Sequence, residues 1–243
     1  SSSAASDVYK RQLVDDRGAV WVGHFQAGLD YSLYQNGLFR TYAYPPLFNS
    51  ANLSIRSFVN RGQEKVIGSR DGLFYINEAT GVVKSFVKPV LTSDLILTIS
   101  FYQGEYYIGT YGGGMMVLNP GTLSLKYFAQ GDTELFQKGH IFCVKPDAKG
   151  NLWIGTSQGL FCYNGQTKQI KHFTSANSQL PEGNVYEVSF DSTGKGWIAT
   201  ETGMCIYDPA SQSLRSNVFP EGFVHRDKVR TIYEDAGHNL YFI

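Results

Sequence analysis

Short apolar runs alternate with polar turn residues along almost the whole chain, and residues 184–219 show this pattern most clearly. There the runs are NVYEVSF, WIAT, MCIYD and SLRSNVF, and Asp, Ser and Gly recur in the segments between them. Short runs separated by such residues are typical of β-strands joined by tight turns. No stretch repeats its apolar residues at the spacing of a helix face. The pattern therefore predicts an all-β chain with few helices.

A three-residue anchor recurs along the chain: a bulky residue, then Val, Ile or Phe, then usually Gly or Ala. The anchors are 41 to 46 residues apart and begin at Trp21, Val66, Tyr107, Trp153, Trp197 and Tyr241. A fixed period in this range is typical of repeat folds, and four short strands per repeat are typical of a β-propeller blade. Each repeat then reads as four strands joined by polar turns, with the anchor in the second strand.

The anchor strand is predicted to lie between two neighbouring blades. In NLWIGT (residues 151–156) both faces of the strand are apolar, as expected for a strand covered on both sides. The small third residue of the anchor would let the adjacent sheet approach closely. It is found at Gly23, Gly68, Gly109, Gly155 and Ala199.

The repeats predict an incomplete propeller, with four complete units flanked by two partial ones in residues 13–243. The first unit has no convincing first strand, and the sixth stops inside its second strand at Ile243. Residues 1–12 have no blade pattern, so a non-native or disordered leader is expected there, although a natural flexible leader is the alternative. The leader has no apolar core of signal-peptide length, and nothing in the chain approaches a transmembrane span.

Composition and charge agree with this fold class. The chain has 21 basic and 21 acidic residues, so no overall field favours nucleic acid or an anionic membrane as a partner. Cys143, Cys162 and Cys205 fall in predicted strands without CxxC spacing and are expected to be small buried apolar residues. Their odd number argues against a disulfide framework and leaves the redox compartment open.

The usual signatures of catalysis and cofactor binding are missing from the sequence. The five His residues lie far apart without an HxH or HExxH pair, so no metal site is expected. There is no G-x-S-x-G nucleophile motif. The segment YGGGMM (residues 111–116) lacks GxGxxG and a following helix, so we interpret it as a widened turn. We therefore predict no catalytic residue and no cofactor.

One Asp-containing motif, D-x-x-G-x-x-W, recurs along the chain. It begins at Asp147 and again at Asp191, and it ends at the anchors Trp153 and Trp197. The motif superficially resembles the Asp-box of sialidase propellers, which has one residue fewer between Asp and Gly. Because a catalytic motif would not be needed in every blade, we interpret it as a structural turn.

The repeat as a whole resembles the two-component regulator propeller repeat. The segment VKPDAKGNLWIGTSQGLFCYN (residues 144–164) resembles it most, and residues 188–208 and 14–32 match with local departures. The units at Val66 and Tyr107 lack both the Trp and the Asp-x-x-Gly turn, as degenerate blades would. The resemblance covers essentially everything after Leu13.

The resemblance implies a sensor from a Gram-negative, glycan-degrading bacterium. In such sensors two seven-bladed propellers and an immunoglobulin-like domain lie in the periplasm, followed by a membrane helix and a histidine kinase. Their ligands are often oligosaccharides, and their ectodomains commonly form homodimers. The resemblance thus implies part of a seven-bladed ring in a periplasmic ectodomain of an inner-membrane protein. The adjoining propeller and immunoglobulin-like domains would be partners, and any kinase activity would lie outside this chain.

Three function classes are compatible with the sequence. The leading one is a ligand-sensing ectodomain that signals to a histidine kinase. The second is a propeller glycosidase or polysaccharide lyase, which would need carboxylates, or Arg with Tyr or His, converging at one mouth of the channel. The third is a non-catalytic protein-interaction platform, which needs only shaped loops.

A ligand surface is predicted where the turns vary between repeats. The turns between second and third strands share one propeller face with the residues that open the first strands, among them Asn52, Asp94, His140, Asn184 and Lys228. Aromatic rings pack on sugar faces and polar groups bind hydroxyls, so mixed side chains on this face suit a polyhydroxylated ligand. The ligand-binding group predicted from the sequence is Phe25, Arg70, Tyr111, His140 and Glu201.

Overall fold

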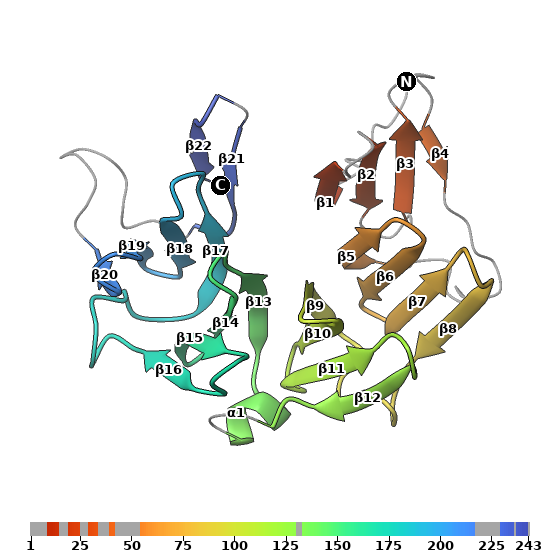
Figure 1. Ribbon diagram of the computed structural model, residues 1–243, viewed down its shortest axis with the longest axis horizontal. Coiled ribbons are helices and arrows are strands. Elements are labelled where there is room, and N and C mark those ends of the chain that lie inside the picture. Colours follow the sequence, from red (N-terminus) through yellow and green to blue (C-terminus); the bar gives the residue numbers. More distant parts are fainter. Residues whose placement is uncertain are drawn as a thin grey trace, which may run out of the picture. The chain divides into compact units, whose positions relative to one another are not determined.

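The computed structural model describes residues 9–14, 19–24, 29–33, 39–41, 54–129, 133–216, 229–235 and 237–242. For residues 9–41 it describes the backbone alone, except at Val20 and Trp21. The chain divides into two compact units, residues 1–99 and residues 100–243. Figure 1 shows that the described elements are almost all strands.

Two four-stranded antiparallel sheets belong to the first unit, and in each the spatial order follows the chain order. The first sheet consists of β1 (Tyr9–Val14), β2 (Ala19–His24), β3 (Leu29–Leu33) and β4 (Phe39–Thr41). The second consists of β5 (Ile55–Arg61), β6 (Glu64–Ser69), β7 (Leu73–Asn77) and β8 (Val82–Phe86).

The same up-and-down sheet continues along the rest of the chain. The next sheet consists of β9 (Ile96–Tyr102), β10 (Glu105–Thr110), β11 (Met115–Asn119) and β12 (Ser124–Tyr127). After α1 (Thr133–Lys138) comes the sheet of β13 (Ile141–Pro146), β14 (Asn151–Thr156), β15 (Gly159–Asn164) and β16 (Ile170–Phe173). It is followed by the sheet of β17 (Val185–Phe190), β18 (Gly196–Thr200), β19 (Gly203–Asp208) and β20 (Ser213–Arg215). A two-stranded sheet of β21 (Ile232–Glu234) and β22 (Leu240–Phe242) ends the described chain.

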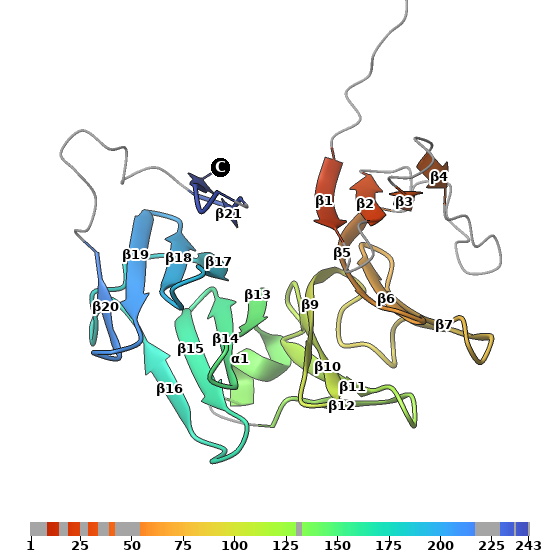
Figure 2. The same cartoon turned by 45° about the horizontal axis from the view of Figure 1, so that its top comes forward.

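Within the second unit, the first strands of successive sheets are neighbours. β13 packs beside β17, and β17 packs beside β21. Figures 1 and 2 show β13 and β17 side by side, while β16 and β20 form the opposite edges of their sheets. Of the described residues, none belongs to a helix long and apolar enough to cross a membrane.

The expectation that the first repeat lacks a first strand is wrong. β1 begins at Tyr9, inside the expected leader, and pairs antiparallel with β2 so that Leu13 faces Trp21. The described residues therefore form five four-stranded sheets rather than four. The strand was missed because YKRQLV carries mostly polar side chains, whereas its pairing with β2 rests on backbone hydrogen bonds that do not depend on them.

All six anchors lie in the second strand of their sheets, as the period predicted. Trp153 is 1% exposed, because two rings cover it. Phe173 of its own sheet stacks on it with the ring centroids 5.9 Å apart, and the ring centroid of Tyr207 in the next sheet lies 4.4 Å away. Trp197 is only half-buried, and it contacts Phe242 of the two-stranded sheet at 5.8 Å. The position of an anchor therefore follows from the repeat, while its burial depends on the neighbouring sheet.

The small residue of the anchor does permit close sheet contact. A Cβ added to Gly155 would lie 2.5 Å from the Cys143 sulfur and 2.7 Å from the Val185 carbonyl oxygen of the next sheet. Real Cβ atoms do not approach other atoms this closely, so any larger residue would push the two sheets apart. The predicted reason for glycine at this position is confirmed.

The paired tryptophans give a matched test of interblade burial. The indole N–H of each donates to a turn carboxylate, from Trp153 to Asp147 at 2.9 Å and from Trp197 to Asp191 at 2.8 Å. Replacing either Trp with Ala removes the same hydrogen bond. The difference between the two variants in the free energy of unfolding therefore reports how tightly each ring is packed. We expect Trp153→Ala to lower the free energy of unfolding by about 3–5 kcal/mol and Trp197→Ala by less than half of that. Urea unfolding measures both, and equal losses would contradict the burial argument.

Candidate functional site

The structure places the five predicted ligand residues in different surroundings. Phe25 lies outside the described residues, as do Asn52 and Lys228. Arg70 is an exposed residue in the turn after β6 of the first unit. Tyr111, His140 and Glu201 belong to the second unit, which is where the candidate site is found.

Tyr111 and His140 are brought into direct contact. Tyr111 lies in the turn between β10 and β11 and is 50% exposed, whereas His140 directly precedes β13 and is half-buried. Their rings stack, with centroids 4.0 Å apart and planes inclined by 22°. Two residues predicted separately therefore form one surface.

Two further rings extend this stack along the first strands. Phe142 of β13 lies 6.2 Å from His140, and Tyr186 of β17 lies 5.2 Å from Phe142 in an edge-on arrangement. The Arg230 guanidinium lies over the Tyr186 ring, 5.4 Å from its centroid. Tyr111, His140, Phe142 and Tyr186 are called the aromatic row below, and Arg230 stands at its end.

A β-bulge underlies the position of the two added rings. The pairing of β13 with β14 shifts register between Ile141 and Cys143, and the pairing of β17 with β18 shifts between Val185 and Glu187. The residue skipped by each shift is Phe142 or Tyr186, and both side chains are half-buried between fully buried neighbours. A bulge leaves one residue unpaired and re-aims its side chain, which is why bulges often occur at functional sites.

The sequence analysis missed Phe142, Tyr186 and Arg230. The residues predicted to open the first strands, such as His140 and Asn184, were placed on the predicted ligand surface, and the residues that follow them were not considered. A usable signal was present, because Phe142 and Tyr186 follow the buried apolar residue that opens their strand, and Arg230 follows the buried Val229 shortly before β21. The bulge that turns this position outward has no motif in the sequence.

Polar groups fix one side of the row. The Asn184 amide nitrogen donates to the Glu201 carboxylate at 3.0 Å and lies 3.2 Å from the Tyr186 hydroxyl. Glu201 also faces Gly183, where an added Cβ would lie 2.8 Å from the Glu201 Cβ. Glu201 thus orients Asn184 and, through it, Tyr186.

The ring faces and the outer polar groups of the row are what a ligand can contact. The His140 Nδ1 atom is buried and has no hydrogen-bond partner among the described residues, so it does not face a ligand on this surface. The aromatic row therefore combines ring faces, a phenol and a nearby guanidinium, a combination suited to binding.

Hydrolysis would need more than the row supplies. Glycosidases use a pair of carboxylates on opposite sides of the scissile bond. Of the described residues that contact the row, Glu201 brings one carboxylate, and that carboxylate is held by Asn184. No group of three or more His, Cys, Asp or Glu side chains that could hold a metal ion occurs in the described part of the chain.

The three cysteines are free thiols in β13, β15 and β19. Burial raises the pKa of Cys143, Cys162 and Cys205 to about 12. At neutral pH they stay protonated and are weak nucleophiles. They act as small apolar side chains, although Cys162 is only half-buried.

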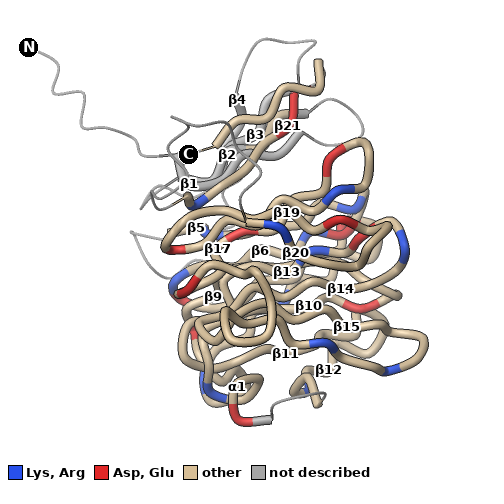
Figure 3. Tube along the Cα trace, turned by 90° about the vertical axis from the view of Figure 1, so that its left-hand side faces the viewer, with Lys and Arg blue, Asp and Glu red and all other residues tan. Residues whose placement is uncertain are grey.

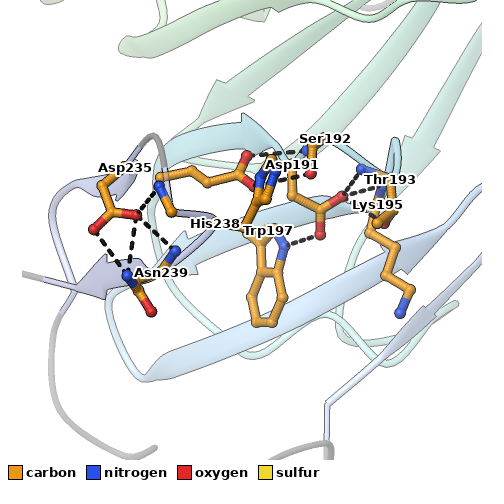
Figure 4. Close-up of polar contacts among 10 residues, drawn as sticks. Asp191, Ser192, Thr193, Lys195, Trp197, Asp235, His238 and Asn239 are labelled. Carbon is orange, nitrogen blue, oxygen red and sulfur yellow. Dashed lines mark hydrogen bonds and ion pairs between the residues drawn. The ribbon is translucent and has the colours of Figure 1, made fainter.

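The Asp motif forms a structural turn. The Asp191 carboxylate accepts hydrogen bonds from the Thr193 and Lys195 backbone N–H groups at 2.9 and 3.0 Å and from the Trp197 indole at 2.8 Å (Figure 4). Both carboxylate oxygens are thus engaged in holding the turn and the anchor. The interpretation of the motif as structural is supported.

The same turn recurs in two other sheets. Asp147 accepts from the Lys149 and Asn151 backbone N–H groups and from the Trp153 indole. Asp235 accepts from the Asn239 backbone and side chain, and Figure 4 shows this cluster beside His238. A phenol replaces the indole in this last sheet, since the Tyr241 hydroxyl donates to Asp235 at 3.0 Å.

The hydrogen bonds change the acidity of the turn residues. Burial alone would raise the pKa of Asp191, but hydrogen bonds from Thr193, Trp197 and Lys195 outweigh it and hold the pKa below its ordinary value. Hydrogen bonds from the Asn239 side chain and backbone lower the pKa of Asp235 to about 2. The ionised form of each carboxylate is therefore the one that the turn requires.

Charge is otherwise mixed over the second unit. Figure 3 shows basic and acidic positions interspersed along its strands and turns. This mixture fits the equal numbers of basic and acidic residues in the chain.

Comparison with known families confirms the sequence resemblance. The family model of the two component regulator propeller matches residues 136–158, which run from α1 through β13 and the Asp147 turn to the residues after the Trp153 anchor. The chain therefore carries the two-component regulator propeller repeat. A comparison with curated proteins gives no match.

Solved structures share the fold. The extracellular domain of a protein assigned as the hybrid two component system BT3049 of B. thetaiotaomicron matches 95% of this chain and 32% of its own, with 23% identity and a TM-score of 0.77. The corresponding domain of BT4673 from the same organism matches 99% of this chain and 37% of its own, with 18% identity and a TM-score of 0.69.

A third match comes from a different system. PorZ of Porphyromonas gingivalis, a surface component of the type-IX secretion system, matches 95% of this chain and 36% of its own, with 15% identity and a TM-score of 0.66. The chain spans about a third of the length of these structures. The fold is thus a β-propeller fold built from four-stranded antiparallel blades, as the period predicted.

Acid should weaken the Asp turns over a defined pH range. An unfolded Asp has a pKa of about 3.9, so a folded-state pKa near 2 stabilises the fold fully above about pH 5 and loses this contribution as the pH falls toward 2. We expect the Asp235 carboxyl to titrate at about pH 2 in carboxyl-detected NMR. The Asn239→Ala variant, which removes the side-chain donor, should move the titration upward. Titration of Asp235 near pH 4 in the unmodified protein would contradict the assignment.

Proposed function

We propose that the chain is a ligand-sensing propeller from the extracellular part of a two-component sensor, and that its aromatic row binds an oligosaccharide. The observation that carries the proposal is the continuous row of Tyr111, His140, Phe142 and Tyr186 across three successive sheets. The family match over residues 136–158 supports a sensor role. The fold shared with extracellular domains of two hybrid systems supports an extracytoplasmic location, here the periplasm.

The row suits a chain-shaped, polyhydroxylated ligand. Its successive ring centroids are 4.0, 6.2 and 5.2 Å apart, so the rings form an extended surface rather than a single pocket. Sugar rings pack their C–H faces on aromatic rings, while polar groups fix their hydroxyls. The Tyr186 hydroxyl and the Arg230 guanidinium are the polar groups of the row that could bind such hydroxyls.

Occupancy of the row would couple neighbouring blades. Tyr111 belongs to the sheet of β10, Phe142 to that of β13 and Tyr186 to that of β17. A ligand lying along the row contacts all three and favours the arrangement in which the rings are aligned. In the proposed sensor this preference is passed to a histidine kinase outside this chain. The adjoining propeller, the immunoglobulin-like domain and a second ectodomain copy are the partners through which it would pass.

A protein-interaction platform is the second candidate. PorZ shares the fold at a TM-score of 0.66 and is named as a secretion-system component rather than a sensor. An exposed aromatic row beside an Arg is also typical of protein-binding hot spots. The two candidates differ in ligand, so one binding experiment separates them.

The aromatic row is tested with a triple variant, Tyr111→Ala, His140→Ala and Tyr186→Ala. Its matched control replaces Tyr127, His172 and Tyr233, which are the same residue types exposed away from the row. Oligosaccharides released from plant and host polysaccharides are screened on an array, and hits are measured by calorimetry. We expect the row variant to lose about tenfold or more in affinity, because truncating a contact ring costs over about 1 kcal/mol. The control should bind as the unmodified protein does.

Two outcomes would count against the proposal. Equal affinities of the row variant and the control would remove the row as the binding surface. Binding of no oligosaccharide on the array, together with capture of a defined protein partner that the row variant fails to bind, would favour the interaction platform.

A further inference from the structure

A second site lies at the opposite end of β13 from the aromatic row. A cavity of about 250 Å³ opens between the sheet of β13–β16 and the sheet of β17–β20. Its floor is formed by Trp153, Phe173 and Tyr207, and its walls include Lys149, Lys171 and Gln212. All its lining residues belong to the second unit.

The strand pairing explains why this cavity is polar at the rim and apolar at the floor. Trp153 pairs with Cys162, and Cys162 pairs with Lys171, so the three side chains share the face of the sheet that meets β17–β20. Residues further toward the turns on this face are polar, beginning with the cross-strand pair Asn151 and Asn164. The interface thus changes from packed rings to amides and ammonium groups within a few residues.

The charged side chains that line the cavity are basic. They are Lys149 and Lys171, and none of the described lining residues is an Asp or Glu. The Asp147 carboxylate lies behind the lining, where it accepts hydrogen bonds from the Asn151 side chain and the Trp153 indole and offsets part of this positive charge. An anion in the cavity would therefore meet two ammonium groups without an opposing carboxylate among the lining residues.

Both ammonium groups are held toward the neighbouring sheet by neutral acceptors. The Lys149 Nζ donates to the Pro209 carbonyl oxygen at 3.2 Å, and the Lys171 Nζ donates to the Gln212 side-chain oxygen at 3.0 Å. An ammonium group has three N–H donors, and each of these contacts uses one. A carboxylate is a stronger acceptor than a carbonyl or an amide, so it would gain from the same donors.

The preceding interface of the repeat is built differently. There the Tyr102 hydroxyl donates to the Gly150 carbonyl oxygen at 2.6 Å and accepts from the Gly165 N–H at 2.9 Å. It bridges the turns of the next sheet with a neutral phenol, whereas Lys149 reaches the corresponding turn at Pro209 with a cation. The positive charge is therefore particular to this interface and is not required by the blade fold.

We propose that this cavity binds a small hydroxylated carboxylate of about the size of a single uronic acid. The two lysines would bind the carboxylate and the Asn, Gln and Thr side chains of the walls would bind hydroxyls. The half-buried rings of Phe173 and Tyr207 would pack on the C–H face of the ligand, with the buried Trp153 behind them. The volume is below the range of about 300–1,000 Å³ common for drug-sized ligands, which limits the ligand to one sugar ring. This site shares no residue with the aromatic row, so neither proposal depends on the other.

The indole signals of the chain provide the readout. The chain has three Trp residues, of which Trp153 lines the cavity. In ¹⁵N-labelled protein we expect D-glucuronate to shift the Trp153 indole signal at millimolar concentration and to leave those of Trp21 and Trp197 in place. D-glucose lacks the carboxylate and acetate lacks the hydroxyls, so both should shift the Trp153 signal at least tenfold more weakly.

The lysines are tested with Lys149→Gln and Lys171→Gln in one variant. Its control carries Lys126→Gln and Lys195→Gln, which removes the same charge at exposed positions outside the cavity. We expect the cavity variant to bind D-glucuronate about tenfold or more weakly, since charge-assisted bonds are lost, and the control to bind normally. Added salt should also weaken binding.

Several results would overturn the proposal. They are no Trp153 shift with D-glucuronate up to about 10 mM, equal shifts with D-glucose or acetate, or equal weakening in the cavity and control variants. None of these outcomes affects the aromatic row, which is tested with different residues and ligands.

Discussion

The hydrogen bond from an anchor side chain to a turn carboxylate is the constraint on which the last three sheets of the second unit depend. In the Asp191 turn, one carboxylate closes the hairpin between the first and second strands and also holds the Trp197 indole. The turn and the interblade contact are therefore formed by the same residue. A substitution that disturbs the turn therefore also weakens the interblade contact, and the reverse holds too. Both oxygens of the carboxylate are already in use, so it cannot replace a lost hydrogen bond.

Blades without the Trp reach the same geometry by other means. The β9–β10 hairpin closes with Gln103 and Gly104 in left-handed conformations, with φ of 47° and 85°. Its anchor, Tyr107, is buried against Tyr102 and Phe128, and this burial raises its pKa. In the β5–β8 sheet the Tyr75 hydroxyl donates to Glu64 at 2.7 Å across the sheet. The repeat thus conserves the position of the anchor while the polar bond that supports it varies.

The period of the sequence predicted most of the strands and sheets, because turns and anchors have local chemical signatures. The recurring anchor and its spacing were enough to place the second strands, and all six anchors are where they were expected. Local pattern failed where structure depends on a partner. The strand beginning at Tyr9 forms because β2 provides backbone hydrogen bonds to it. Trp197 is only half-buried because the next described sheet has two strands and brings the Phe242 ring against it. The aromatic row was found only in part, since the bulges at Phe142 and Tyr186 come from pairing register and leave no motif.

Two departures from the repeat bring Tyr111 and His140 into the aromatic row, whereas Phe142 and Tyr186 occupy a bulge that recurs in other first strands. The turn between β10 and β11 is longer than those after β14 and β18, and α1 is inserted before β13. The two are fitted together: the Gly114 N–H donates to the Gly139 carbonyl oxygen at 2.9 Å, and a Cβ on Gly114 would clash with the Phe136 carbonyl oxygen at 1.9 Å. Phe136 is fully buried against Phe128 and Phe161, so the helix is fixed to the core. His140 lies two residues after this helix, and Tyr111 begins the widened turn. The glycine run therefore has a structural role, because it lets the turn and the helix meet closely enough for the two rings to stack.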